Sequence, residues 1–329
     1  MRLSTPVLCL LALVVPGMAH AETVKIGTVK VAAAGPTFVA AEKGFFAAEG
    51  LMPEFVFFEA PQPVAVAVVS GDLDFGQAAA TAALYTFGGQ GAIKIVAGIA
   101  REVPGFPLNA FVASNRAYEA GLTSYTALPG HTVAVGTIGS PGHYILGRLA
   151  EKYGFDLKSL QLQPLQSIPN IISAISGGQS DASITAVNGV LPAIQHGDMK
   201  LLGFAGDVLP WQVGTLIVST KTAAERGDTI KRFLRAASKG AKLYHDAFTG
   251  PDEKRLDGPT APEILAILSK YIGQPPEVVA RGVSYNDSAM RLDVKDVLHQ
   301  IAWYKSQGMV KGDFDPNAMI DMRYVVPLP

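Results

Sequence analysis

Short apolar runs alternate with segments of helical character along the first third of the chain. Val24–Thr28 is a compact apolar run, and Pro36 then opens a helical segment that reaches Lys43. Proline suits the first turn of a helix, because the N–H that it lacks would be unpaired there in any case. The pattern also predicts a helix at 64–69 and strands at 55–59, 74–76 and 93–99. Strands that alternate with helices favour a mostly parallel sheet.

A second block repeats this order. It begins with an apolar run at 132–137, and Ser140-Pro141 then supplies an N-cap and a first-turn proline for a helix. Apolar positions of this helix recur at i, i+3, i+4 and i+7, which places them on one buried face. These positions are Leu146, Leu149, Ala150 and Tyr153. The remaining elements predicted for this block are a helix at 170–175 and strands at 160–162, 181–185 and 200–204.

Short sequences recur between the two blocks in the same order. Ile26-Gly27-Thr28 returns as Val135-Gly136-Thr137, and Ala41-Glu42-Lys43 returns at the same separation as Ala150-Glu151-Lys152. Two similar lobes in one chain imply a cleft between them, and such a cleft is a place to hold a small molecule. The fold class predicted is therefore α/β, with two lobes and a cleft.

The connections between the lobes are predicted from two further apolar runs. Leu108–Ala113 leaves the first lobe and Thr215–Val218 returns to it, and we expect these runs to be paired crossing strands that act as a hinge. Apolar stripes at 230–244 and 294–304 predict helices that pack back onto the first lobe. The expected division is therefore 22–112 with 219–329 for lobe 1, and 113–218 for lobe 2.

The N-terminus has the features of a secretory signal peptide over residues 1–21. Arg2 precedes a nine-residue apolar stretch, Val7–Val15, and Ala19-His20-Ala21 fits a small-x-small cleavage site. The stretch is too short for a membrane span, which needs about 20 apolar residues. Cys9 is the only cysteine and leaves with this segment, so the mature chain has no disulfide and no thiolate metal site. A periplasmic location is expected.

Charge and motifs exclude several classes of function. The formal net charge is −1, so there is no basic field for nucleic acid or anionic lipid. The histidines that follow the signal peptide stand far apart, and the sequence has neither a nucleophile elbow nor a P-loop. We expect no catalytic residue, no metal, no cofactor and no enzymatic activity.

Several segments in fixed order resemble a known family. They are Ala40–Phe46 with Glu49–Leu51, Ser70–Gly76, Leu128–Gly130, Gly139-Ser140 with His143, Gly177–Ala182 and Ile230–Ala236. The chain resembles the periplasmic solute-binding proteins of ABC importers of the nitrate/sulfonate/taurine type, which are related to pyrimidine-precursor binding proteins. The resemblance implies a type II periplasmic-binding fold, with two α/β lobes, two hinge strands and capture of a ligand by closure. The usual pattern is not kept in the first cleft loop, 31–38, where Thr37 is the only side-chain donor.

The start of the second-lobe helix is the first candidate for ligand contact. Free N–H groups at a helix start, at the positive end of its dipole, attract carboxylate or sulfonate oxygens. The donors would be Gly142, His143 and the Ser140 hydroxyl, beside Gly139. Ser140 could instead only cap its own helix, and His143 could be a packed or solvated helix residue.

Further candidates follow the carboxyl ends of the predicted strands, where ligands of open α/β sheets sit. They are Gly35, Thr37 and Phe38 after the first strand, Gln77, Ala78 and Ala79 after the third, Thr185 and Asn188 in the second lobe, and Arg101 and Trp211 between the lobes. Phe38 could be a core residue instead, and Asn188 a turn residue. Trp211 could lie in an exposed loop, and Arg101 in a solvated loop or an ion pair.

These features predict a periplasmic substrate-binding protein of an ABC importer. It would capture a small organic anion, a carboxylate or sulfonate with an apolar or aromatic body, and deliver it to the permease and its ATPase subunits. A monomer is expected. A neutral heterocycle such as a pyrimidine is the alternative ligand, and an extracytoplasmic ligand sensor is the alternative function.

Overall fold

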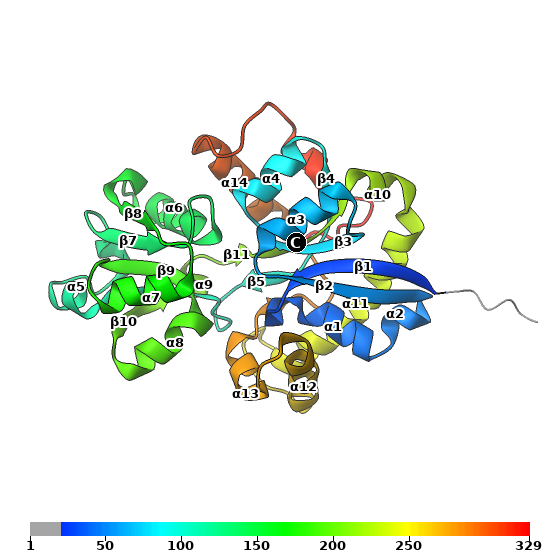
Figure 1. The fold of residues 1–329 in the computed structure, drawn as a ribbon, viewed down its shortest axis with the longest axis horizontal. Coiled ribbons are helices and arrows are strands. Elements are labelled where there is room, and N and C mark those ends of the chain that lie inside the picture. Colours follow the sequence, from blue (N-terminus) through cyan, green and yellow to red (C-terminus); the bar gives the residue numbers. More distant parts are fainter. Residues whose placement is uncertain (1–20) are drawn as a thin grey trace, which may run out of the picture.

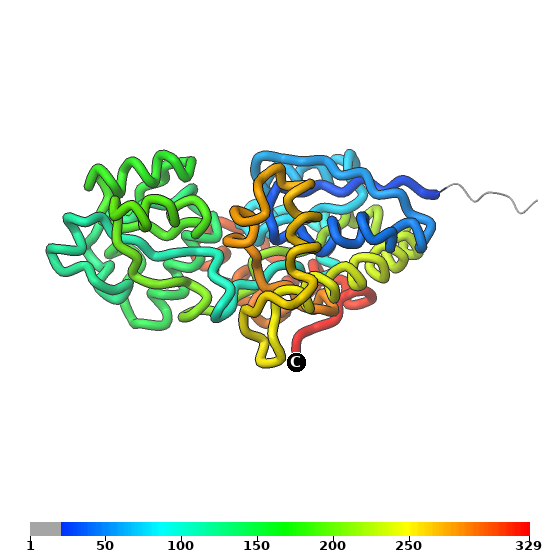
Figure 2. The backbone as a smooth tube through the Cα atoms, turned by 90° about the horizontal axis from the view of Figure 1, so that it is seen from below, coloured from blue at the N-terminus to red at the C-terminus, as the bar shows by residue number. Residues whose placement is uncertain are grey.

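The computed structural model describes residues 21–329. The predicted signal peptide, 1–21, lies outside the described residues except for Ala21. The chain forms two α/β bodies side by side, one built mainly from the middle of the chain and the other from both of its ends (Figures 1 and 2). Between residues 21 and 329, no helix has the length and apolar character needed to cross a membrane.

The first body is built on a five-stranded sheet of order β2-β1-β3-β12-β4. Its strands are β1 (Glu22–Val29), β2 (Leu51–Phe58), β3 (Phe75–Ala79), β4 (Ile93–Gly98) and β12 (Gly214–Ser219). Strand β1 pairs in parallel with β2 and β3, whereas β12 runs antiparallel between β3 and β4. The connecting helices are α1 (Gly35–Glu42), α2 (Phe45–Ala48), α3 (Pro61–Ser70) and α4 (Ala82–Gly89).

The second body has the same topology, with sheet order β10-β6-β9-β7-β8. Its strands are β6 (Asn109–Ser114), β7 (Thr132–Val135), β8 (Gln161–Pro164), β9 (Ala182–Ala186) and β10 (Met199–Phe204). Its helices are α5 (Asn115–Glu119), α6 (Pro141–Tyr153), α7 (Ile168–Ser176), α8 (Val187–His196) and α9 (Ala205–Val208). In each sheet, the strand that runs against the others lies between the third and fourth strands of the repeat. The internal repeat read from the sequence therefore corresponds to a repeat of topology.

The crossing between the bodies differs from the prediction. The runs Leu108–Ala113 and Thr215–Val218 do not pair with each other, because they become β6 and β12 in two different sheets. A small third sheet, of order β11-β5-β13, makes the crossing instead. Its strands are β5 (Ala100–Glu102), β11 (Trp211–Gln212) and β13 (Tyr285–Asn286). The prediction was wrong because an apolar run indicates burial in a sheet, while the crossing strands are short and partly polar.

The C-terminal third of the chain is mostly helical. Its elements are α10 (Thr220–Glu225), α11 (Gly227–Phe248), α12 (Ala261–Ile272), α13 (Pro276–Val279) and α14 (Val294–Ser306). Short 3-10 helices are distributed along the whole described chain, at η1 (Ala32–Ala34), η2 (Tyr125–Ala127), η3 (Leu157–Ser159), η4 (Ala280–Gly282) and η5 (Pro316–Met319). Helix α11 packs on α1 so closely that a Cβ at Gly240 would collide with the Pro36 carbonyl oxygen. This helix lies on the first body as predicted.

Helix α14 packs on the first body, as expected, and also contacts the second. Its Trp303 ring covers Gly147 of α6, where no larger residue would fit. The Tyr304 hydroxyl donates to the carbonyl oxygen of Ser140, at 3.2 Å. On the other side, the Tyr85 hydroxyl of α4 donates to Oε1 of Gln300, at 2.8 Å. One continuous apolar cluster therefore extends from the first sheet through α14 to the second.

A buried carboxylate holds the crossing strands together. Glu102 of β5 is fully buried. Its Oε1 accepts the backbone N–H groups of Leu108 and Asn109, at 2.9 and 2.7 Å. Its Oε2 accepts the Asn109 side-chain amide and the Trp211 indole N–H, at 2.7 and 2.9 Å. Burial raises the pKa of Glu102, and the hydrogen bonds from Asn109 and Trp211 oppose that rise. One side chain thus joins β5, β11 and the start of β6.

We expect Glu102→Gln to lower the free energy of unfolding by about 1–3 kcal/mol. The substitution keeps the shape of the side chain but places an NH₂ group against N–H donors, so that one pair of them loses its acceptor. Urea unfolding of the mature protein measures the change, with Glu119→Gln at an exposed position as the control. Equal stability of the two variants would contradict the role given to Glu102.

Candidate functional site

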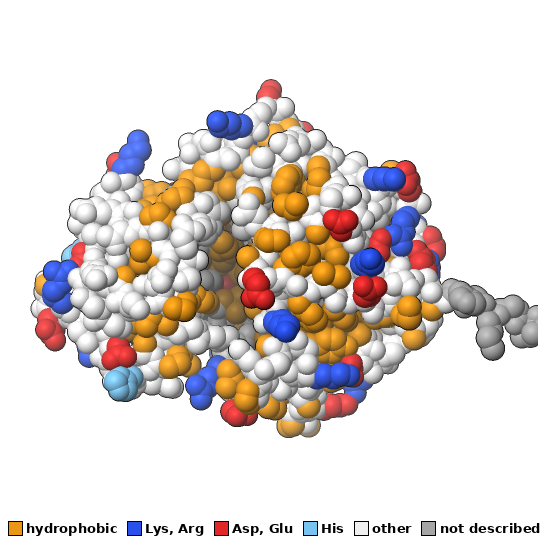
Figure 3. Space-filling model, viewed as in Figure 1, with side chains coloured by type: hydrophobic (Ala, Val, Ile, Leu, Met, Phe, Trp, Pro, Cys, Tyr) orange, Lys and Arg blue, Asp and Glu red, His pale blue; other side chains and the backbone are white. Residues whose placement is uncertain are grey.

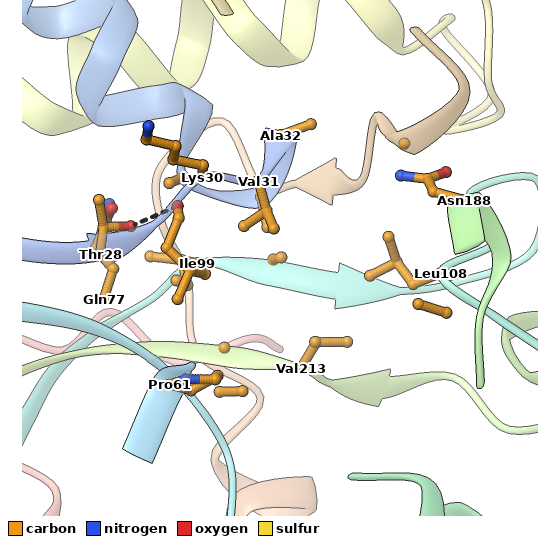
Figure 4. A pocket seen from close by; sticks show the side chains of 18 of the residues that line it. Thr28, Lys30, Val31, Ala32, Pro61, Gln77, Ile99, Leu108, Asn188 and Val213 are labelled. Carbon is orange, nitrogen blue, oxygen red and sulfur yellow. Dashed lines mark hydrogen bonds between the residues drawn. The ribbon is translucent and has the colours of Figure 1, made fainter. Parts of the chain in front are cut away.

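A cavity of about 440 Å³ lies where the two bodies meet. This volume is in the range of small-molecule sites. The surface is hollowed between the two bodies, with hydrophobic side chains on both sides (Figure 3). The lining comes from both bodies and from the crossing segments, as Thr28, Ile99, Leu108, Asn188 and Val213 illustrate (Figure 4).

The first body supplies the carboxyl ends of its central strands to this cavity. Thr28 of β1 and Gln77, Ala78 and Ala79 of β3 line it, as does the loop that leads into η1. Pairing of Gly27 with Gly76 places Thr28 and Gln77 at neighbouring strand ends. Open α/β sheets bind ligands at this edge, because the strands end there and their connecting loops diverge.

Few polar side chains line the cavity, and most of its wall is apolar. The polar ones are Thr28, Lys30, Gln77, Asn109, Asn188 and Gln274. Among the described residues, Lys30 is the only lining residue with a charged side chain, and it is exposed. Its Nζ lies 5.4 Å from the centre of the Phe57 ring. The wall therefore offers little to balance the charge of a buried ion.

Gln77 and Thr37 form a buried hydrogen-bonded pair at this wall. The Thr37 hydroxyl lies 3.0 Å from the Ala34 carbonyl oxygen, to which it donates. The Gln77 side-chain Nε2 donates to Thr37 Oγ1, also at 3.0 Å. Thr37 itself lies behind the wall and does not line the cavity, although it holds a residue that does.

One of the predicted donors at the start of α6, the His143 N–H, is used within its own helix. Ser140 Oγ accepts the His143 backbone N–H at 3.4 Å, as an N-cap does. The Gly139 N–H donates to His143 Nδ1 at 3.2 Å. A Cβ at Gly142 would face the Ile184 carbonyl oxygen. Of this segment only Pro141 lines the cavity, and proline has no N–H to donate.

His143 is buried against α14. Its ring meets Trp303 edge-on, with centroids 5.2 Å apart. Burial lowers the pKa of His143, so the imidazole is neutral near pH 7. Acceptance of the Gly139 N–H by Nδ1 also requires an unprotonated nitrogen there. His143 therefore supplies no positive charge to the cleft.

The other predicted site residues divide between the cavity and the core. Asn188 lines the cavity, whereas Thr185 is buried outside its lining. Gly35 packs under Tyr244, and the Phe38 ring stacks on that of Tyr271 at 4.5 Å. These two positions belong to the packing of α1.

Arg101 and Trp211 belong to the crossing and do not line the cavity. The Arg101 guanidinium pairs with Asp293 at 3.0 Å. Trp211 is fully buried, and its indole N–H is held by Glu102. Both residues therefore contribute to the hinge.

Sequence reasoning missed several lining residues. Thr28 ends the first strand and could have been found by the same rule that selected Gln77. Asn109 follows the crossing, whose position was misassigned. The sequence contains no pattern that marks a C-terminal stretch of the first body as part of the site, because this stretch reaches the cavity only through the packing of α12 and α13. Its lining residues are Ile272, Gln274, Val279 and Gly282.

No cluster of three or more His, Cys, Asp or Glu side chains suited to a metal ion is found in the part of the chain that the structure describes. The lining residues within 28–282 include no carboxylate, imidazole or thiol. The described site is thus a shaped apolar cavity with a few hydrogen-bonding groups.

Comparison with protein families finds a match over residues 32–253 to a family model described as NMT1/THI5 like. A comparison with curated proteins found no match.

Solved structures share the fold of the whole chain. The periplasmic aliphatic sulphonate binding protein SsuA from Escherichia coli has a TM-score of 0.72 and 17% identity, over 92% of this chain and 98% of that one. The alkanesulfonate-binding protein SsuA from Xanthomonas axonopodis pv. citri, bound to MOPS, has a TM-score of 0.68 and 18% identity, over 91% and 98%. The periplasmic nitrate-binding protein NrtA from Synechocystis PCC 6803 has a TM-score of 0.65 and 14% identity, over 91% of this chain and 85% of that one. The predicted two-lobed periplasmic-binding fold is confirmed.

We expect the stability of the protein to fall below about pH 6.5 in part because of His143. A histidine whose folded-state pKa is lowered binds its proton more readily in the unfolded chain, so acid favours unfolding. The loss begins near the unfolded pKa and continues until the pH reaches the folded one. One such group changes the free energy of unfolding by at most about 1.4 kcal/mol per pH unit.

Urea unfolding at pH 7.5 and 5.5 measures this contribution. His143→Gln should narrow the difference between the two pH values, because glutamine does not titrate. His196→Gln is the control and should not narrow the difference, since that imidazole is exposed and its pKa is raised by Asp198, which favours the folded state at low pH. An unchanged difference in His143→Gln would show that His143 does not carry the effect.

Proposed function

The chain belongs to the NMT1/THI5-like family, and from that premise we propose that it is the solute-binding component of an ABC importer. Its fold is that of periplasmic binding proteins, in which a solute is held between two lobes. The observation that carries the proposal is the position of the cavity, which takes its walls from both bodies and from the crossing between them.

The proposed mechanism is capture by closure of the lobes about the crossing strands β5 and β11. Closure is a shift between open and closed populations, which a solute drives only through better contacts with the closed form. The two walls already approach each other at one point, where a Cβ at Gly282 would collide with the Asn188 side-chain nitrogen. We place the lobe boundaries at this crossing, near the predicted residues 112 and 218.

Delivery requires a membrane permease and its ATPase subunits as partners. The predicted signal peptide would direct export and then be cleaved. The mature chain, which begins near Glu22, would be a monomer in the periplasm. The cavity favours binding over catalysis, because its described lining holds no carboxylate or imidazole for proton transfer. Neighbouring genes for a permease and an ATPase would support this assignment over the sensor alternative.

We propose an uncharged, largely apolar small molecule as the solute, in preference to the organic anion expected from the sequence. A buried anion needs a partner charge or several donors, since its transfer from water is otherwise costly. At the helix start that was expected to supply them, the His143 N–H is taken by Ser140, and of that segment only Pro141 lines the cavity. The apolar walls suit the body of a ring, with Gln77, Asn109 and Asn188 available to orient it.

We expect Ala79→Leu to weaken solute binding at least tenfold without loss of stability. Ala79 is half-buried at the carboxyl end of β3, so a larger side chain would occupy the cavity. A thermal-shift screen of the mature protein against uncharged rings, carboxylates and sulfonates identifies binders, because a ligand at 100 times its Kd stabilises by about 2.7 kcal/mol. Calorimetry then compares the variants.

Ala48→Leu, at an exposed position on α2, is the matched control and should bind as the wild type does. Equal affinity of Ala79→Leu and Ala48→Leu would place the binding site outside this cavity. A screen in which only carboxylates and sulfonates bind would overturn the uncharged solute and favour the organic anion.

A further inference from the structure

Gln77 is the most deeply buried side-chain amide among the residues that line the cavity. It is 3% exposed, near the carboxyl end of β3, between β1 and β12. Its side-chain amide points toward Thr28 in the close view of the cavity (Figure 4). The inference below rests on the proposed function, since it concerns the solute that this cavity would hold.

The hydrogen bonds of Thr37 orient the Gln77 amide. The Thr37 hydroxyl has a single proton, which it donates to the Ala34 carbonyl oxygen at 3.0 Å. Thr37 Oγ1 can then only accept from its other neighbour, which must be the NH₂ end of Gln77. This arrangement leaves Oε1 as the free end of the Gln77 amide.

The remaining end of the amide is an acceptor without a donor. Gln77 Oε1 is buried and has no hydrogen-bond partner among the described residues. Buried polar atoms are nearly always paired, and an unpaired one opposes folding. A second buried glutamine shows the ordinary arrangement. Gln300 Oε1 accepts from Tyr85, while its Nε2 donates to Gln212 and Asp296.

We propose that Gln77 determines which solutes this cavity accepts: a small turn of its side chain brings the buried Oε1 to the cavity wall, where it takes a hydrogen bond from an N–H or O–H group of an uncharged solute. An acceptor-only head such as a carboxylate or sulfonate would set lone pairs against lone pairs at this wall. A binding site that holds an unpaired group discriminates strongly between a solute that satisfies it and an analogue that does not. Thr37 is a positioning residue, because it decides which end of the amide is free.

The first test needs no ligand and compares two glutamine substitutions. Gln77→Met removes the unpaired oxygen together with one hydrogen bond, so the Tm of the unliganded protein should stay within about 2 °C of the wild type or rise. Gln300→Met breaks a fully paired side chain and should lower Tm by more than about 4 °C. A Gln77→Met loss as large as that of Gln300→Met would show a structural glutamine and overturn the inference.

The second test uses probes of one shape and different polarity. Benzamide offers N–H donors, whereas benzoate and benzenesulfonate offer only acceptors on the same ring. Calorimetry on the wild type should show benzamide binding at least tenfold more tightly than either anion. This preference should fall below about threefold in Gln77→Met. It should also fall in Thr37→Val, where the amide is free to turn its NH₂ group outward.

The outcomes separate the inference from the proposed function. A benzamide preference that survives in Gln77→Met overturns the role of Gln77 and leaves the solute-binding function standing. If the wild type binds benzoate or benzenesulfonate more tightly than benzamide, and Gln77→Met does not change this, the role of Gln77 is likewise overturned and the solute-binding function stands. Failure of all three probes and of every compound in the solute screen to bind would instead overturn the proposed function.

Discussion

The buried carboxylate of Glu102 is the constraint on which the arrangement of the two bodies depends. It accepts N–H groups from Leu108 and Asn109, where the chain enters the second sheet, and from Trp211, where it returns. A buried carboxylate is tolerated only when its oxygens are satisfied, so the two crossings are held in one geometry. The cavity lies at these crossings, and its position follows from this contact.

Asp296 of α14 makes a second connection, between the crossing and the second body. Its side chain accepts the Gln212 backbone N–H at 2.8 Å, the Tyr144 hydroxyl at 3.1 Å and the Arg148 guanidinium at 3.1 Å. Burial raises the pKa of Asp296, and the hydrogen bond from Gln212 opposes the rise. Helix α14 is thus bound both to β11 and to α6. In the proposed closure, the lobes would pivot near these two carboxylates, because both tie the crossing strands to neighbouring elements.

The sequence predicts the helices and strands of this fold better than it predicts which strands pair with one another. The repeat of Ile26-Gly27-Thr28, the proline at the start of α6 and the apolar stripe of α11 all have local causes, and the structure shows each of them. The crossing was misplaced because hydropathy reports burial and not which strand lies alongside. The rule that ligands bind at the carboxyl ends of strands selected Gln77, Ala78, Ala79 and Asn188, all of which line the cavity. No local pattern marks Gln274, which reaches the cavity only through the packing of distant helices.

Polarity at the cleft depends on which hydrogen-bonding groups are left unpaired after folding. At the start of α6, the Gly139 and His143 N–H groups are both taken by side chains of the same turn. At the end of β3 the opposite holds, because Thr37 orients Gln77 and leaves its oxygen unpaired. In the proposed function, a fold shared with sulfonate- and nitrate-binding proteins would thus offer its solute an acceptor. The fold places the cleft, and the pairing of a few side chains within it sets the chemistry of what it can hold.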